Sequence, residues 1–93
     1  MEIRLVKLIT GDSFVAEMIE EGSDYVVFDG AFMIVPTPNG QMAMIPFLFG
    51  AKNDVFSIVQ EHIVYNLEAS DQLCNIYKEH TNKGVLTPGS LLV

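Results

Sequence analysis

Few side chains in this 93-residue chain could carry metal chemistry. Zinc sites are built from thiolates and imidazoles, and the chain has one cysteine and two histidines: Cys74, His62 and His80. Cys74 and His80 are six residues apart, so on a helix they point to different faces, and no second cysteine completes a site. The sequence therefore predicts a packed cysteine and two surface imidazoles, with no metal and no cofactor.

Carboxylates occur in pairs, but beside turns. Glu20 adjoins Glu21, and Asp24 precedes Asp29 by five residues, in polar stretches where acidic side chains are normally solvated. A carboxyl group that works as a general acid needs burial to keep its proton near neutral pH. The chain also lacks a glycine-rich phosphate loop, a G-x-S-x-G elbow and an H-E-x-x-H pair. We expect a protein that is not an enzyme.

Amino-acid composition and net charge exclude further classes of protein. The chain is 49% hydrophobic and 18% charged, which favours a folded domain over disorder. Twelve acidic against five basic residues give a net charge of −7, which repels phosphate backbones and excludes a conventional basic nucleic-acid binder. A chain this short buries only about 60–65% of its unfolded surface. Some apolar surface must stay outside, so we expect a homo-oligomer.

The same data favour a cytoplasmic protein without membrane contact. A single cysteine forms no internal disulfide and permits a reducing compartment. The opening residues carry no basic and apolar leader, so no secretory signal is expected. The longest nearly apolar stretch, residues 42–51, contains Pro46 and Gly50, whereas a membrane-spanning helix needs about 20 apolar residues.

Short apolar segments separated by turn residues predict a mainly β fold, as a small barrel or sandwich. Expected strands span residues 2–9, 13–20, 25–35, 41–49, 55–58 and 63–67. In the second segment Phe14 and Ala16 share one face, and Val15 lies on the other. Gly30 interrupts the third segment and indicates a bulge or a sharp bend.

One helix is expected after the strands, over about residues 70–83. Ser70 is a good N-cap and Gly84 suits the C-terminal cap. Four residues share one helix face: Leu73, Ile76, Tyr77 and His80. Residues 85–93 are apolar without a helix signal, and we expect an extended tail across the same subunit or a neighbour. Residues 1–93 are predicted to be a single domain, with the barrel over about residues 1–68.

Two segments resemble the motifs of Sm-like (LSm) proteins. Val-Lys-Leu-Ile-Thr-Gly-Asp at residues 6–12, followed by a second strand, is similar to the first half of the Sm1 motif, and Tyr-Val-Val-Phe at 25–28 resembles its apolar end. Ile-Val-Gln-Glu-His-Ile-Val at 58–64 resembles the Sm2 segment, where a brief turn joins strands four and five. The whole pattern is most similar to small Sm-like proteins of marine phage and metagenome origin.

The resemblance implies a small, strongly bent, five-stranded Sm-like (SH3-type) barrel with a C-terminal helix. It also implies a bacterial host cell if the chain is phage-encoded. Most Sm proteins carry their helix at the N-terminus, so the late helix is a departure from the family.

The resemblance further implies binding of single-stranded RNA. The family's Arg-Gly is replaced by Gln60-Glu61, whereas Glu61-His62 keeps the histidine of the Lys-His pair found in the bacterial Hfq branch. Tyr25 falls near the position of the family's asparagine. The expected RNA-binding residues stack on bases or bond to their edges; they are Asp24, Tyr25, Gln60 and His62.

In Sm-like rings strand four of one subunit pairs with strand five of the next, and we expect a closed ring of about five to seven subunits. In the expected fourth strand Phe47 alternates with Ile45 and Phe49 on one face. The expected interface residues are Met42, Met44, Phe47, Phe49, Ile63 and Tyr65. Two alternatives stay open: a scaffold ring that binds a protein partner instead of RNA, which the net charge favours, and a monomeric barrel.

Overall fold

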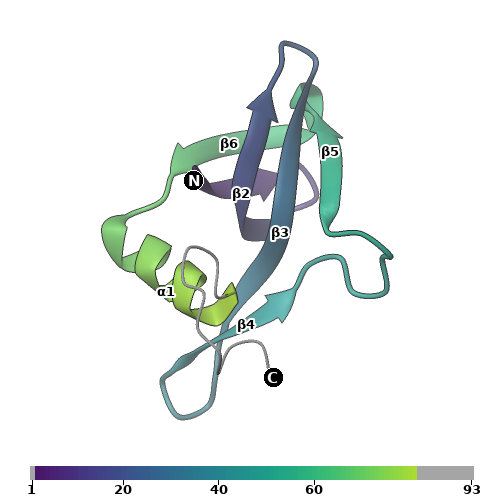
Figure 1. The fold of residues 1–93 in the computed structure, drawn as a ribbon. Helices are drawn as coiled ribbons and strands as arrows, with labels where there is room; N and C mark the ends of the chain where they lie inside the picture. The colour runs from purple at the N-terminus through teal and green to yellow at the C-terminus, as the bar shows by residue number, and fades with distance from the viewer. Residues whose placement is uncertain (1, 82–93) are drawn as a thin grey trace, which may run out of the picture.

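The computed structural model describes residues 2–81, which form an antiparallel sheet, a short 3-10 helix and one α-helix (Figure 1). The strands are β1 Ile3–Leu8, β2 Ser13–Glu21, β3 Tyr25–Pro36, β4 Met42–Pro46, β5 Val55–Val59 and β6 Ile63–Glu68. The 3-10 helix η1 spans Gln60–His62, and the helix α1 spans Asp71–Thr81. The mainly β class with a helix after the strands is confirmed, with six strands in the sheet.

The sheet has the order β4-β3-β2-β1-β6, and β5 pairs with β3. One edge of β3 pairs with β2, and the other edge is shared by two strands. The first half of β3, Tyr25 to Asp29, pairs with β5, and the second half, Phe32 to Pro36, pairs with β4. Gly30 lies between the two halves with φ of 66°, a left-handed conformation that suits glycine, so the predicted bend occurs there.

The strand expected over residues 41–49 is shorter than predicted. It ends at Pro46, and residues 47–50 form a turn in which the N–H of Ala51 donates to the carbonyl oxygen of Leu48 (3.1 Å). The predicted alternation of Phe47 with Phe49 on one strand face is therefore wrong. Phe47 packs on Phe14 with ring centroids 4.9 Å apart, whereas Phe49 is 91% exposed.

Two hydrophobic clusters lie on the two faces of the sheet. The first is built around Phe14, whose ring meets Phe28 edge-on at 5.1 Å, and its buried members are Val6, Phe14, Ala16, Val26, Phe28 and Ala31. The second has Ile3, Val15 and Tyr77 as its buried members. Because Phe14 and Val15 belong to different clusters, the predicted alternation along β2 is confirmed.

Helix α1 begins as predicted, since the Oγ of Ser70 accepts a hydrogen bond from the N–H of Leu73 (3.2 Å). On the predicted apolar face Tyr77 is fully buried, and the His80 ring meets Phe32 edge-on at 5.0 Å. The Tyr77 hydroxyl donates to the carbonyl oxygens of Gly30 (2.7 Å) and Asp29 (3.3 Å). The helix is thus fixed to the bend of β3. Gly84 and the predicted tail, residues 85–93, lie outside the described residues.

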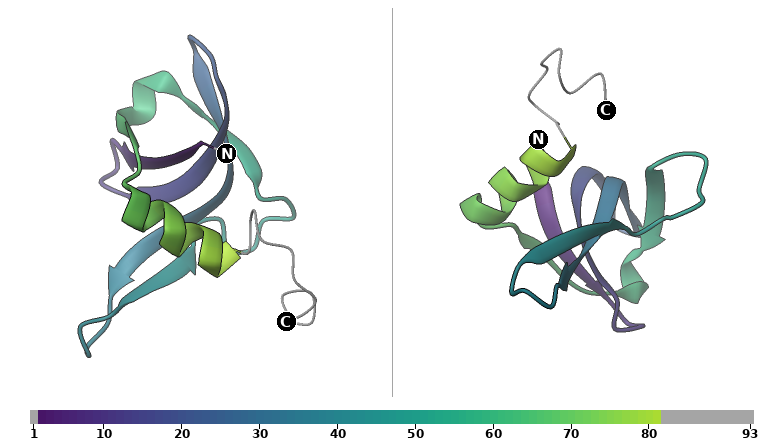
Figure 2. Two further views of the ribbon diagram at one scale, coloured as in Figure 1. Left: turned by 60° about the vertical axis from the view of Figure 1, so that its left-hand side comes forward. Right: turned by 90° about the horizontal axis from the view of Figure 1, so that it is seen from below.

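The sheet does not close within residues 2–81. β6 pairs with β1 alone, and β5 pairs with β3 alone, so each strand keeps one unpaired edge in this part of the chain. The three residues of η1 join these two strands directly (Figure 2). No helix in the described range is long and apolar enough to cross a bilayer.

Candidate nucleic-acid interface

The turn between β2 and β3 is tied to the junction of β5 and η1. The backbone N–H of Gln60 donates to the carbonyl oxygen of Asp24 (2.8 Å), and the Gln60 side-chain amide donates to that of Gly22 (2.9 Å). Gly22 itself donates to the Tyr25 carbonyl oxygen (2.9 Å), and a Cβ at position 22 would lie only 3.1 Å from that oxygen. The structure therefore brings Asp24, Tyr25 and Gln60 together from segments about 35 residues apart.

A hollow of about 270 Å³ opens at this junction, and we call it the turn hollow. Its lining residues are Ser23, Asp24, Val59, Gln60 and Glu61. Tyr25 stands beside it, because Tyr25 is directly opposite Val59 in the β3–β5 register. The Tyr25 side chain is 45% exposed, so its ring has room for a stacked base.

His62 is at the other end of η1 and lines a different depression. This strand groove, of about 400 Å³, is lined by Leu8, Ile9, Thr10, Ser57, Ile58, Val59 and His62. The His62 carbonyl oxygen accepts a hydrogen bond from the N–H of Ile9 (2.9 Å), which holds η1 against the end of β1. The two depressions meet at Val59, so His62 adjoins the turn hollow without lining it.

The turn hollow is lined by acidic side chains. Two exposed carboxylates, Asp24 and Glu61, line it, the exposed Glu20 and Glu21 precede its turn in the sequence, and none of its lining residues is a cation. A phosphate chain would meet repulsion here, whereas bases that carry amino groups would meet acceptors. The chemistry of the hollow is that of hydrogen-bond acceptors beside an accessible aromatic ring.

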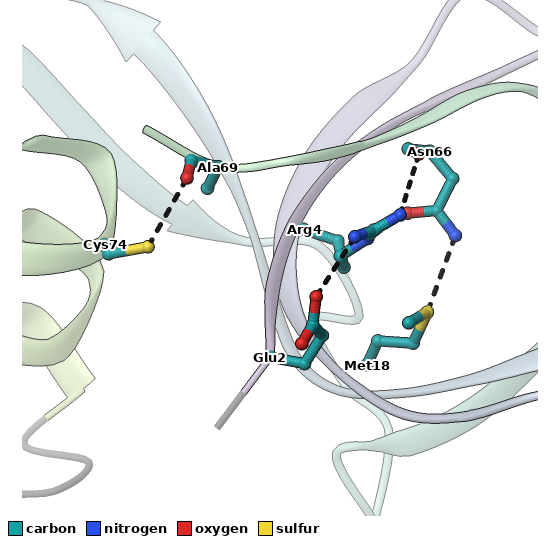
Figure 3. A network of polar contacts seen from close by, with 6 residues as sticks. All are labelled: Glu2, Arg4, Met18, Asn66, Ala69 and Cys74. Carbon is teal, nitrogen blue, oxygen red and sulfur yellow. Dashed lines mark hydrogen bonds and ion pairs between the residues drawn. The ribbon is translucent and has the colours of Figure 1, made fainter. Parts of the chain in front are cut away.

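Arg4 is engaged within the sheet. Its Nε donates to the Asn66 Oδ1 (2.8 Å), and one Nη donates to the Asn66 carbonyl oxygen (3.1 Å), as Figure 3 shows in part. Another Nη pairs with Glu2 at 3.1 Å. The Asn66 amide in turn contacts the sulfur of Met18 at 3.6 Å. Arg4 therefore braces β1 against β6, a role that sequence pattern alone does not signal.

The candidate metal ligands do not come together. The Sγ of Cys74 contacts the carbonyl oxygen of Ala69 at 3.7 Å (Figure 3), and His80 rests on Phe32. In the described part of the chain, no three His, Cys, Asp or Glu side chains are grouped to hold a metal ion.

The predicted interface residues are divided between the two ends of the sheet. Met42 and Met44 lie on β4, where Met44 packs against the second cluster, and Phe47 packs into the first. Ile63 and Tyr65 lie half-buried on β6. The two groups do not form one surface on a subunit.

Sequence reasoning missed the exposed aliphatic residues of the two strands beside η1. They are Val55 (55%) and Val59 (45%) on β5, and Val64 (57%) and Leu67 (52%) on β6. The sequence of β5 already indicates such exposure, because apolar residues occur on both of its faces. Phe56 and Ile58 pack against the first cluster, and the two valines face outward.

No protein-family model matches the chain, and no curated protein matches its sequence. Function therefore has to be inferred from the geometry of the turn hollow and of the unpaired strand edges.

Proposed function

We propose that this chain is the subunit of an Sm-type homo-oligomeric ring that binds single-stranded RNA through its bases. The two hydrogen bonds from Gln60 to the β2–β3 turn support this function most strongly. They join the segment that resembles the Sm1 motif to the one that resembles the Sm2 motif, at the place where Sm-like proteins hold RNA.

The strand order fits a bent Sm-like barrel. β4 and β5 share one edge of β3, so together they correspond to the single fourth strand of the family, interrupted by residues 47–54. η1 corresponds to the brief turn between strands four and five, and β6 pairs with β1 as the fifth strand. The bend at Gly30 allows β3 to serve both halves.

Assembly follows from the unpaired edges of β5 and β6. A free strand edge exposes N–H and C=O groups that readily pair with another strand, and aliphatic side chains flank both edges here. Pairing β5 of one subunit with β6 of the next is a head-to-tail contact, which closes into a ring by rotation. Each subunit contributes one edge of each kind, so the ring leaves neither edge exposed.

Base recognition relies on stacking and on acceptors. Tyr25 is exposed enough to stack, and Asp24 offers carboxylate oxygens. Gln60 already uses its amide nitrogen on Gly22, so it offers its side-chain oxygen. Adenine and cytosine present amino groups to such acceptors, whereas uracil has no amino group. The ring should prefer A-rich over U-rich RNA and make few phosphate contacts.

The test is a fluorescence titration with labelled A-rich and U-rich oligonucleotides at about 50 and about 200 mM salt. Each phosphate contact to a single strand adds about 0.7 to the slope of log K against log salt, and we expect a slope below about 2. Because stacking contributes about 1–3 kcal/mol per base, Tyr25→Ala should weaken binding by about 5-fold to 150-fold. Lys52→Ala, in the exposed loop before β5, serves as the matched control and should change binding little.

A steep salt slope with an unaffected Tyr25→Ala variant would contradict base recognition at the turn hollow. Absence of binding to either RNA at low salt would instead favour a second function, a scaffold ring for a basic protein partner. The net charge of −7 and the two carboxylates that line the hollow favour that alternative.

A further inference from the structure

We infer that the groove between the β3–β4 hairpin and α1 is the docking site for the chain's own C-terminal segment, residues 85–93, folded back on the same subunit. We call this depression of about 240 Å³ the helix groove. Its lining residues are Ile34, Met42 and Met44 from the hairpin, and Ser70, Gln72, Leu73 and Ile76 from the start and middle of α1. The inference does not depend on RNA binding or on the ring.

The helix groove is apolar and open to solvent. Met42 is 60% exposed and Ile76 is 42% exposed, although the hairpin and the helix run side by side (Figure 2). A second hollow of about 170 Å³ shares Ile34 and Met42 with it and continues past Leu5. The two hollows therefore adjoin at Ile34 and Met42, and together they offer apolar lining to a peptide segment.

The lining favours aliphatic side chains over a small polar ligand. None of the lining residues is charged, and Ser70 and Gln72 are its only polar members. The volume is below the range of about 300–1,000 Å³ that is typical of small-molecule sites. Methionine side chains adapt their shape to whatever packs on them, and two of them line this groove.

Residues 85–93 have the matching chemistry. They carry no charged side chain in a protein of net charge −7, and their aliphatic members are Val85, Leu86, Leu91, Leu92 and Val93. An uncharged aliphatic segment meets no repulsion from the acidic surface and loses water-exposed apolar area when it enters the groove.

Residues 82–93 are long enough to extend from the end of α1 back to the helix groove. Ile76 is five residues before Thr81, or about 7.5 Å along the helix axis. Residues 82–93 can span about 40 Å when extended, so the chain can reverse and run antiparallel to α1. If Leu86 packs beside Ile76, an extended Leu91 would lie about 16 Å further on, past Leu73 and within reach of Met42 on the hairpin.

Docking within one subunit is favoured over exchange between subunits because the tether is short. A short flexible connection holds a segment near its site at an effective concentration in the millimolar range. A tail from a free second copy reaches this concentration only in very concentrated protein, and a tail from an adjacent subunit of a ring would give a cross-link between two chains in the experiment below.

Cysteine cross-linking in the full-length chain tests the location. In a Cys74→Ala background, Met42→Cys combined with Leu91→Cys should form a disulfide within one chain under oxidised glutathione, seen as a cross-linked species of monomer mass. The control pair, Ile19→Cys with Leu91→Cys, should not cross-link, since Ile19 is on β2 away from the groove. Cross-links between two chains, or none in the first pair, would overturn docking within the subunit.

Carboxypeptidase digestion tests the contact without engineered cysteines. A docked tail is digested at a rate proportional to its undocked fraction. Ile76→Glu puts a charge in the groove at an exposed helix position, and it should speed release of the terminal residues at least about tenfold relative to the unaltered chain. Ile19→Glu, at a position on β2 that is 53% exposed, should leave the rate unchanged. Equal rates for Ile76→Glu and the unaltered chain would overturn the inference.

Discussion

Gln60 shows how one residue can position a site. Its backbone and side-chain amides both donate to the β2–β3 turn, so a single residue of η1 fixes the loop that carries Asp24 and Tyr25. The neighbouring Gly22 leaves room for the close approach of the Tyr25 carbonyl. The site is therefore held by the backbone and the side-chain amide of Gln60, which leaves the Gln60 side-chain oxygen and the exposed Asp24 and Tyr25 side chains to meet a ligand.

Phe47 and Phe49 are two residues apart, but Phe47 packs in the first cluster and Phe49 is exposed to solvent. Phe47→Asp should cost several kcal/mol of unfolding free energy, because the carboxylate would enter the cluster around Phe14 and Phe56 without a partner. Phe49→Asp, at a position that is 91% exposed, should change stability by less than about 0.5 kcal/mol. Urea denaturation of both variants measures the difference. Equal losses would contradict the observed end of β4 at Pro46.

The residue types of the site were predictable, but their separation into two depressions was not. Asp24, Tyr25 and Gln60 were expected together on the strength of the Sm-like motifs, and the structure brings them together. His62 lines the strand groove instead, because the three residues of η1 turn the chain between them. The rotation imposed by so short a helix leaves no trace in composition or periodicity.

At the scale of elements, α1 and the bend of β3 form one unit. The Tyr77 hydroxyl donates to the carbonyl oxygens on either side of the bend, and its ring packs edge-on against Phe32. Helix and sheet are thus joined where β3 passes from β5 to β4. β5, which leads into η1 and the turn hollow, pairs with β3 before this bend, and β4, which lines the helix groove, pairs with β3 after it.

Tyr77→Phe should lower the unfolding free energy by about 1–2 kcal/mol, because the variant keeps the buried ring but leaves the Gly30 carbonyl without this donor. Thermal or urea unfolding measures the loss. Tyr25→Phe is the matched control, since the Tyr25 side chain is exposed, and it should stay within about 0.5 kcal/mol of the unaltered chain. A Tyr77→Phe variant as stable as the control would show that the hydroxyl does not hold the helix to the bend.

Local patterns predicted the elements better than their pairing. The N-cap at Ser70, the bend at Gly30 and the two-faced pattern of β2 all depend on neighbouring residues, and each is observed. The early end of β4 was missed, because Phe47 and Phe49 continue the apolar alternation while packing in the core decides which one turns inward. The pairing of both β4 and β5 with one edge of β3 likewise depends on contacts between residues far apart in the sequence, which local patterns do not reveal.

At the scale of the whole molecule, the unpaired edges of β5 and β6 in the described part of the chain and the exposed aliphatic residues point to assembly. β5 and β6 each keep an unpaired edge within residues 2–81, and each exposes two large aliphatic side chains. The composition already implied too much apolar surface for a chain this short. The location of that surface, on both sides of η1, required the structure. A contact there would also set the turn hollows of adjacent subunits near one another.

Multi-angle light scattering at micromolar concentration, with native mass spectrometry, measures this assembly directly. The unaltered chain of 10.3 kDa should run as one species of about five to seven subunits. Val59→Lys with Val64→Lys places a charge on each edge and should yield a folded monomer. Ile19→Lys, at an exposed position on β2, which pairs with neither β5 nor β6, should leave the ring intact. A stable 10.3 kDa monomer of the unaltered chain, or a ring unaffected by the two lysines, would contradict assembly through β5 and β6.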